Sequence, residues 1–429
     1  MSTSSPWLTV RTDRLLLPVS APSTRYLLVR VNAPSSPPRD GRMPVNISLV
    51  LDRSGSMEDG RKFRLAREAV EQALRMLRSD DCFSLVVYDN EVDVLAPSSL
   101  ATPGAKMRAF DALQSVAPRG STDLGAGWLR GCEQVADHLV GEDAVSRCLL
   151  LTDGLANRGI QDRSELAMHA AELHRRGVST TTFGVGADFD ERLLRDMALE
   201  GGGNFYFIEG ASQIPGMLTG ELGEALDVVV RQAALEITLP RGADAEPVSR
   251  FRSRRAHGDN ELRVDLGDLV SEQELLVVVK VTLPRGEEIG ASATIGVTLT
   301  GRDVTSVTTE LAWTSASDAD AEAQQRDREV DREVARVYAA RAKVAATEAN
   351  HVGDFRAAGR VLQQTAGRIE SYAGDDPELR LLAANLEAAV PMFADAPMDA
   401  LQRHGIFATH LAAARSRGFD QMAQRRQCP

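Results

Sequence analysis

Cysteine is scarce in this chain, and long apolar segments are absent from it. The four cysteines among 429 residues form no Cys-x-x-Cys pair and accompany no histidine cluster, so neither a zinc site nor a disulfide framework is predicted. No run of about 18 apolar residues occurs, which argues against a transmembrane helix. The first residues also lack the basic and apolar segments of a signal peptide. These absences predict a cytoplasmic protein with no membrane partner.

Positive charge is also in short supply. The chain has 49 lysines and arginines against 61 aspartates and glutamates, a formal net charge of -12. Nucleic-acid binding requires clustered basic residues, so no nucleic-acid partner is expected. We interpret the small basic cluster at Arg252, Arg254 and Arg255 as a solvated loop. An acidic chain suits cation binding, but most acidic proteins bind no metal, so charge alone selects no ligand.

The hydrophobic pattern divides the chain into four regions. Residues 1–44 contain short β-type runs separated by prolines and turn residues. Residues 45–230 alternate strands and helices, which predicts an α/β fold with a doubly wound, Rossmann-like, mostly parallel sheet. Residues 231–315 return to strands alone and predict an antiparallel β-sandwich. Residues 316–429 carry apolar stripes at helical spacing and predict an α-helical region.

The strands of residues 1–44 have no helices to alternate with. We therefore expect them to complete the β-sandwich of residues 231–315, so that the α/β domain is inserted in the sandwich or flanked by it. At the boundaries, we expect a helix over residues 214–230 and another over residues 404–418. The helical region shows no 34-residue repeat, so it predicts a bundle or hairpin rather than a repeat array.

The sequence NISLVLDRSGSM at residues 46–57 carries the strongest functional signal. Its apolar run predicts a buried parallel strand that ends at Asp52. Ser54 and Ser56 follow at alternate positions. Carboxylate and hydroxyl oxygens suit a hard divalent cation, Mg2+ or Mn2+. Taken alone, the pattern is equally typical of a polar loop after a strand.

Two further loops are expected to bring oxygen ligands to the same place. RGSTD at residues 119–123 opens a predicted helix, and LLTDG at residues 150–154 ends a second buried strand with a carboxylate. In an open α/β sheet, ligands bind at the carboxyl ends of the strands. All three loops should reach that edge, so together they predict a cation site.

This set of loops strongly resembles the von Willebrand factor A domain and its metal-ion-dependent adhesion site. The resemblance covers about residues 45–230. The flanking strands and helical tail resemble longer bacterial proteins in which this domain sits within a sandwich, so a bacterial protein is expected. The residues that match the metal site are Asp52, Ser54 and Ser56 in DRSGSM, Thr122 in GSTD, and Asp153 in LLTDG.

The resemblance implies a role for each of these residues. Ser54 and Ser56 would ligate Mg2+ directly, with Mn2+ or Ca2+ as alternative cations, and Thr122 would do so in the open state. Asp52 and Asp153 would act mainly through bound water. So few direct anionic ligands leave a coordination position for a Glu or Asp of a partner protein. By family analogy, that partner is expected in a system linked to an AAA+ ATPase.

An enzyme is the competing interpretation. A cation with an open position activates water, and Asp52 follows a strand as phosphatase nucleophiles do. However, Ser54 stands where a haloacid-dehalogenase-type phosphatase needs a second acid, and no G-x-S-x-G nucleophile elbow ends a predicted strand. We therefore predict a cation-dependent protein-binding module that is not an enzyme. The alternatives are a phosphoesterase-like, metal-dependent hydrolase and a scaffold with a silent metal site.

Overall fold

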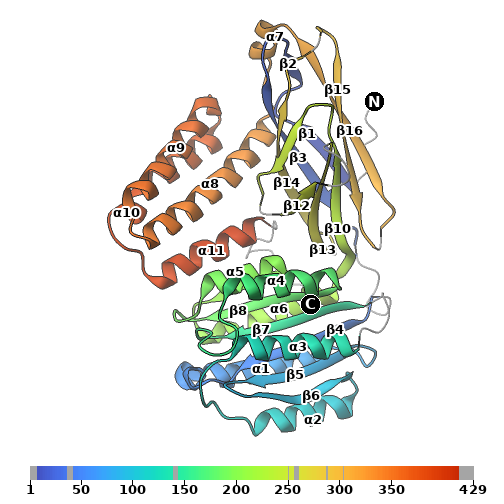
Figure 1. Cartoon of the computed structure of the whole chain (residues 1–429), viewed down its shortest axis with the longest axis vertical. Coiled ribbons are helices and arrows are strands. Elements are labelled where there is room, and N and C mark those ends of the chain that lie inside the picture. Colours follow the sequence, from blue (N-terminus) through green and yellow to red (C-terminus); the bar gives the residue numbers. More distant parts are fainter. Residues whose placement is uncertain are drawn as a thin grey trace. The chain divides into compact units, whose positions relative to one another are not determined.

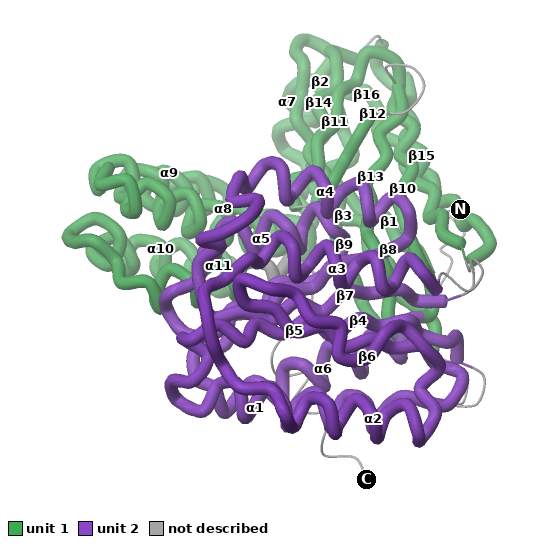
Figure 2. The backbone as a smooth tube through the Cα atoms, turned by 60° about the horizontal axis from the view of Figure 1, so that its bottom comes forward, with its two compact units in different colours: residues 1–35, 229–429 green, residues 36–228 purple. Residues whose placement is uncertain are grey.

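The computed structural model describes residues 7–35, 42–138, 144–249, 251–255, 260–286, 288–302 and 304–414. The chain forms two compact units (Figure 2). One unit contains residues 1–35 and 229–429, and the other contains residues 36–228. The smaller unit is therefore continuous in sequence, whereas the larger one is assembled from both sides of it.

Residues 36–228 fold around a six-stranded sheet with helices on both faces (Figure 1). The strand order is β6-β5-β4-β7-β8-β9, and every neighbouring pair is parallel except β5 with β6. All residues of the central strands β4, β7 and β8 are buried, as expected for a parallel sheet covered on both faces. The strands are β4 (Val45–Asp52), β5 (Cys82–Tyr88), β6 (Val92–Leu100), β7 (Val145–Thr152), β8 (Val178–Val185) and β9 (Gly202–Ile208).

The helices of this unit divide between the two faces of the sheet. Helix α3 lies so close to one face that a Cβ on Gly131 would be 2.2 Å from a methyl carbon of Val50. Helix α6 covers the other face, where Glu221 forms an ion pair with Arg147 of β7. The helical elements are η2 (Gly55–Arg61, a 3-10 helix), α1 (Lys62–Met76), α2 (Pro103–Gln114), α3 (Leu124–Asp137), α4 (Arg163–Arg175), α5 (Glu191–Glu200), η3 (Ala211–Gln213, a 3-10 helix) and α6 (Ile214–Leu226).

Two sheets form a β-sandwich in the other unit. Their orders are β1-β3-β14-β11 and β12-β13-β10-β15-β16-β2, so strands from both ends of the chain share each sheet. Among the strand pairs described for this unit, only β2 with β16 is parallel. The strands are β1 (Leu8–Thr12), β2 (Leu16–Pro18), β3 (Ser23–Asn32), β10 (Val228–Thr238), β11 (Asp244–Pro247), β12 (Arg252–Arg255), β13 (Glu261–Val270), β14 (Glu274–Leu283), β15 (Ser292–Thr300) and β16 (Val307–Ala316).

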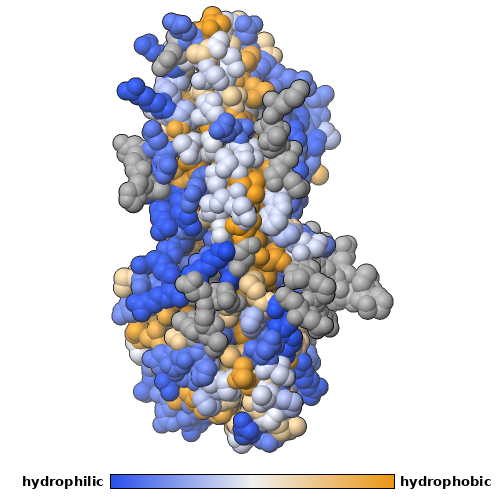
Figure 3. Space-filling model, turned by 90° about the vertical axis from the view of Figure 1, so that its right-hand side faces the viewer, coloured by the Kyte–Doolittle hydropathy of each residue, from blue (hydrophilic) through white to orange (hydrophobic). Residues whose placement is uncertain are grey.

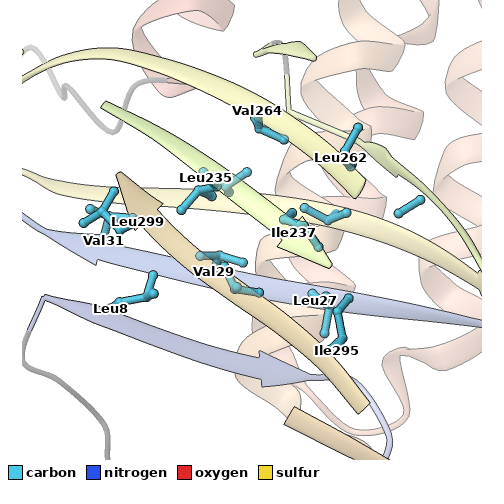
Figure 4. Close-up of a cluster of buried hydrophobic side chains, with 14 of the residues drawn as sticks. Leu8, Leu27, Val29, Val31, Leu235, Ile237, Leu262, Val264, Ile295 and Leu299 are labelled. Atoms are coloured by element: carbon cyan, nitrogen blue, oxygen red, sulfur yellow. The ribbon is translucent and has the colours of Figure 1, made fainter. Parts of the chain in front are cut away.

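Alternate residues of these strands form the sandwich core (Figure 4). Val29 and Val31 of β3 belong to the same buried cluster as Leu235 and Ile237 of β10 and Leu299 of β15. Burying such a side chain contributes roughly 1.5–3 kcal/mol. The first strands of the chain therefore gain their stability from partners that lie far away in the sequence.

Helices complete this unit, and they are α7 (Asp318–Ala323), α8 (Arg328–His351), α9 (Phe355–Ala373), α10 (Pro377–Ala394) and α11 (Ala400–Ala414). Helices α8, α9 and α10 each begin after an aspartate whose side chain caps the first turn. Val330 and Val334 of α8 pack against Leu28 and Val278 of the sandwich. The predicted α/β class, with an antiparallel sandwich and a helical C-terminal region, is confirmed.

Three local predictions need correction. The helix expected over residues 214–230 ends at Leu226, because the β-branched Val228–Val230 stretch begins strand β10. The solvated loop expected at residues 252–255 is strand β12, whose backbone pairs with β13 although its side chains remain largely exposed. The last helix spans Ala400–Ala414, and residues 415–418 of the expected range lie outside the described residues.

Hydrophilic residues interrupted by smaller apolar areas cover the face of the protein drawn in Figure 3. Within the part of the chain that the structure describes, no helix has both the length and the apolar composition needed to cross a membrane.

Cys82, Cys132 and Cys148 are buried free thiols.

Candidate metal centre

The carboxyl ends of β4 and β7 lie side by side at the centre of the parallel sheet. The chain leaves β4 for β5 on one side of this pair and leaves β7 for β8 on the other. Because the loops diverge at such a switch point, a crevice forms between them. Asp52 is the last residue of β4 and Asp153 directly follows β7, so both carboxylates lie at this crevice.

Buried hydrogen bonds shape the first loop. The Asp52 side chain is fully buried, and its Oδ1 accepts a hydrogen bond from the Ser54 backbone N–H at 2.7 Å. Its Oδ2 accepts one from the Thr152 hydroxyl at 2.6 Å. The Ser54 and Ser56 hydroxyl oxygens lie 3.2 Å apart. Ser54 is buried whereas Ser56 is exposed, so the pair of hydroxyls is open to solvent on one side.

Asp153 connects the third loop to the first. The Ser56 hydroxyl donates to Asp153 Oδ1 at 2.6 Å, and the Lys62 ammonium donates to Asp153 Oδ2 at 2.6 Å. The Asp153 side chain is completely buried, and that of Lys62 is 19% exposed. Both carboxylate oxygens therefore contact groups from the segment that follows β4.

Main-chain hydrogen bonds hold the second loop against the first. The Arg119 N–H donates to the Arg53 carbonyl at 2.7 Å, and the Gly55 N–H donates to the Gly120 carbonyl at 3.2 Å. Gly120 has a φ of 71°, a left-handed conformation that glycine adopts without strain. This turn directs the chain toward Thr122.

Thr122 is buried between the second and third loops. Its N–H donates to the Asn157 side-chain oxygen at 2.9 Å, and the Asn157 N–H donates to the Thr122 carbonyl at 3.2 Å. A Cβ added to Gly154 would lie 3.4 Å from the Thr122 hydroxyl and 3.8 Å from the Ser56 hydroxyl. The absence of a side chain at Gly154 therefore leaves space beside these hydroxyls.

The electrostatics of the site favour a bound cation. Burial, together with the nearby charge of Asp153, raises the pKa of Asp52 to about 6 against the lowering effect of its hydrogen bonds. Among the described residues, no cluster of three or more His, Cys, Asp or Glu side chains has the arrangement of a metal cage. The donors here are instead two carboxylates and three hydroxyls. This oxygen-only set, with one ammonium against two carboxylates, fits a hard divalent cation.

The structure thus brings all five residues of the predicted site to one edge of the sheet. Four of them are buried and Ser56 is exposed. Asp123, the neighbour of Thr122, caps α3 by accepting a hydrogen bond from the Ala126 N–H at 3.0 Å. This side chain therefore serves the start of the helix.

Asp89 holds the first two loops together, and sequence reasoning missed it. Its buried carboxylate accepts hydrogen bonds from the guanidinium groups of Arg53 at 3.1 Å and Arg119 at 2.7 Å, and from the Glu91 N–H at 2.7 Å. Burial alone would raise the pKa of Asp89, but these hydrogen bonds and charges outweigh it and lower that pKa. In the sequence, Asp89-Asn90 after an apolar run is typical of a turn that follows a strand, and it gives no signal of this role.

Lys62, Thr152 and Asn157 also contact predicted site residues without having been predicted. Thr152 precedes Asp153 on a buried strand, so its inward position was readable from the strand pattern. Lys62 lies beyond the first loop in the sequence, and no local spacing links it to Asp153. Its contact exists because η2 turns the chain back before α1 begins.

Residues 46–219 match the family model of the von Willebrand factor type A domain. The uncharacterized protein YfbK of Escherichia coli (strain K12) is 26% identical over 243 residues, which cover 56% of this chain and 42% of that protein. The uncharacterized protein sll0103 of Synechocystis sp. is 27% identical over 280 residues, covering 62% of this chain and 64% of that protein. Both matches span less than two thirds of the relative's own length.

Among solved structures, a von Willebrand factor type A protein from Catenulispora acidiphila has a similar fold. The TM-score is 0.73 at 17% identity, and the match covers 97% of this chain and 99% of that one. The similarity therefore extends over the sandwich and the helices as well as the parallel sheet. At this level of identity, it shows the fold alone.

Proposed function

Because residues 46–219 form a von Willebrand factor type A domain, we propose that this chain is a divalent-cation-dependent protein-binding module. Asp52, Ser54, Ser56, Thr122 and Asp153 would hold the cation, with Mg2+ as the expected ion and Mn2+ or Ca2+ as alternatives. Bound there, the cation would offer a coordination position to a Glu or Asp of a partner protein. We also propose that the domain spans residues 45–230, the range predicted from the sequence, although its last three residues begin strand β10 of the sandwich.

The observation that carries the proposal is the convergence of hydroxyls and carboxylates from three loops on one edge of the sheet. Ser54, Ser56 and Asp153 are already joined by hydrogen bonds of 3.2 and 2.6 Å, and Thr122 borders the same space. Such oxygens suit Mg2+, which usually retains several waters and few protein ligands. The exposed Ser56 gives a partner's carboxylate access from solvent.

The chain's own residues would keep this site preorganised. The Ser54 N–H and the Thr152 hydroxyl orient the Asp52 carboxylate from two sides. Asp89 fixes the loops of Arg53 and Arg119 relative to each other. A partner would therefore meet ligands whose positions are already set, which lowers the entropy lost on binding.

The burial of Asp52 favours binding over hydrolysis. Both of its oxygens accept hydrogen bonds and its side chain is fully buried, so it has no path to attack a substrate. We therefore propose a non-enzymatic module in which the sandwich and helices position the cation site or recruit a second protein. By family analogy, the partner would belong to an AAA+ ATPase-linked system in the cytoplasm.

Capture of partner proteins by the immobilised full chain, measured in Mg2+ and in EDTA, tests this function. Ser54→Ala removes a proposed ligand but keeps the N–H that holds Asp52, so the loop should keep its shape. Ser115→Ala is the matched control, because the hydroxyl of this exposed serine donates to the Ala112 carbonyl at the end of α2, away from the site. We expect EDTA and Ser54→Ala, but not Ser115→Ala, to abolish capture.

Other results would favour the alternatives. Capture that EDTA and Ser54→Ala leave unchanged would indicate a scaffold with a silent metal site. Mg2+-dependent phosphoester turnover that Asp52→Asn abolishes would indicate a hydrolase.

A further inference from the structure

Lys62 places a fixed positive charge inside the candidate metal centre. Its ammonium lies 2.6 Å from Asp153 Oδ2, and its side chain is only 19% exposed. Because the Lys62 side chain is only partly exposed and Asp153 is buried, water screens this pair less than a fully exposed ion pair. It contacts one of the two carboxylates that would balance a bound cation.

The backbone conformation before Lys62 directs its side chain toward Asp153. Gly60 has a φ of 61° and Arg61 a φ of 64°, so two consecutive residues adopt the left-handed conformation. This conformation is uncommon for a residue other than glycine. The double turn ends η2 and starts α1 at Lys62, which returns the side chain toward Asp153.

The ammonium of Lys62 changes the net charge of the candidate metal centre. Asp52 and Asp153 contribute -2 and Lys62 contributes +1, so the site without a metal carries -1. With a divalent cation, the same site carries +1. Without Lys62, it would be -2 when empty of metal and neutral when loaded. The guanidinium groups of Arg53 and Arg119 do not alter this comparison, because they pair with Asp89, Glu91 and Asp93.

We propose that Lys62 is a built-in counter-ion that weakens cation binding and strengthens capture of a partner's carboxylate. The inference rests on the proposed function, since it concerns the same cation and the same incoming carboxylate. Lys62 competes with the cation for Asp153 in the metal-free protein. Once the cation is bound, the ammonium leaves the site with a net positive charge that attracts an anion.

A purely structural ion pair makes a different prediction. If Lys62 only anchored α1, its loss would destabilise the metal-free protein and leave both affinities unchanged. A counter-ion instead moves the two affinities in opposite directions. The result to measure is therefore a pair of opposite changes, in the affinity for the cation and in the affinity for the carboxylate.

The test uses the full chain with Mn2+ alone and with acetate as the carboxylate probe. Free Mn2+ is followed by its electron paramagnetic resonance signal. Acetate binding to the Mn2+-loaded protein is followed by broadening of its methyl proton line. Lys62→Met removes the charge, Lys62→Arg retains it, and Arg64→Met is the matched control on the same helix. Arg64 is half-exposed and pairs with Glu68, away from the site.

We expect Lys62→Met to bind Mn2+ about tenfold more tightly, because a unit charge about 6 Å from a divalent ion has roughly this effect even in water. The loaded variant should bind acetate at least about threefold more weakly. Lys62→Arg and Arg64→Met should stay near the wild type in both titrations.

The outcomes separate this inference from the proposed function. Equal Mn2+ and acetate affinities in wild type and Lys62→Met would overturn the role of Lys62 and leave the proposed function intact. Mn2+ binding by Lys62→Met but not by wild type would support the role of Lys62 and overturn the proposed function. If neither protein binds Mn2+, both are wrong.

Discussion

Replacing the buried Asp52 by asparagine should stabilise the metal-free protein at neutral pH. Burial raises the pKa of Asp52 from 3.8 to about 6, so the folded state disfavours the ionised carboxylate. The resulting penalty is absent below about pH 3.8, grows between pH 3.8 and 6, and is complete above pH 6. The asparagine side chain is never ionised and avoids this penalty.

The size of the effect follows from the contacts of Asp52. A shift of about two pKa units corresponds to about 3 kcal/mol. Asparagine retains an oxygen for the Ser54 N–H but presents an N–H to the Thr152 hydroxyl, which now donates at 2.6 Å. The Thr152 hydroxyl would then have to accept instead of donate, and weakening this hydrogen bond costs about 1 kcal/mol. The net gain of about 2 kcal/mol should raise Tm by about 4–8 °C for a unit of this size.

Thermal unfolding of the full chain measures this effect. In EDTA at about pH 7.5, Asp52→Asn should melt above wild type, and the difference should shrink at about pH 4.5, where Asp52 is largely protonated. Mg2+ should raise the Tm of wild type but not that of the variant. Asp80→Asn is the control, since Asp80 is exposed and pairs with Arg78, away from the site. A lower Tm for Asp52→Asn in EDTA at neutral pH would refute the reasoning.

Three further predictions concern the buried carboxylates Asp52, Asp89 and Glu221. The affinity for Mn2+ should fall by up to about tenfold per pH unit below pH 6, because Asp52 takes up a proton. An affinity that stays constant from about pH 7.5 to about pH 5 would exclude Asp52 from the site. Asp89→Ala should lower the free energy of unfolding in urea by about 3 kcal/mol, because it leaves the buried Arg53 without its buried partner. Asp93→Ala, at a half-exposed residue, should lower it by less than about 1 kcal/mol. Equal losses for the two variants would contradict this ranking. Glu221→Gln should lower the free energy of unfolding by about 3 kcal/mol, because it weakens the buried pair with Arg147. It should leave Mn2+ affinity unchanged, because α6 covers the opposite face of the sheet from α3. A reduced Mn2+ affinity would show that this ion pair and the candidate metal centre are coupled.

Local patterns in the sequence were sufficient for the fold class and for the placement of the five site residues. Continuous apolar runs predicted buried parallel strands, and a carboxylate at the end of such a strand has to reach the edge where ligands bind. Strands without neighbouring helices predicted a second sheet system, which the pairing of β3 with β14 now shows. Whether the five residues hold a cation remains a prediction.

Contacts made across the fold could not be predicted in this way. Lys62 reaches Asp153 only through the double left-handed turn at Gly60 and Arg61, and an arginine gives no sequence signal for this conformation. Asp89 gathers two arginines from separate loops, and either of them could have been an ordinary surface residue. The strand β12 was missed because its backbone pairing with β13 overrides the polar character of its side chains.

The central claim is that the hydroxyls of Ser54 and Ser56, with Thr122, Asp52 and Asp153, hold a divalent cation open to an incoming carboxylate. Anomalous scattering from crystals of the full chain grown with Mn2+ and acetate tests it most directly. We predict a single manganese peak within ligand distance of both serine hydroxyls, with acetate or water completing its coordination. A protein that shows no peak there, or manganese only at another site, would contradict the account.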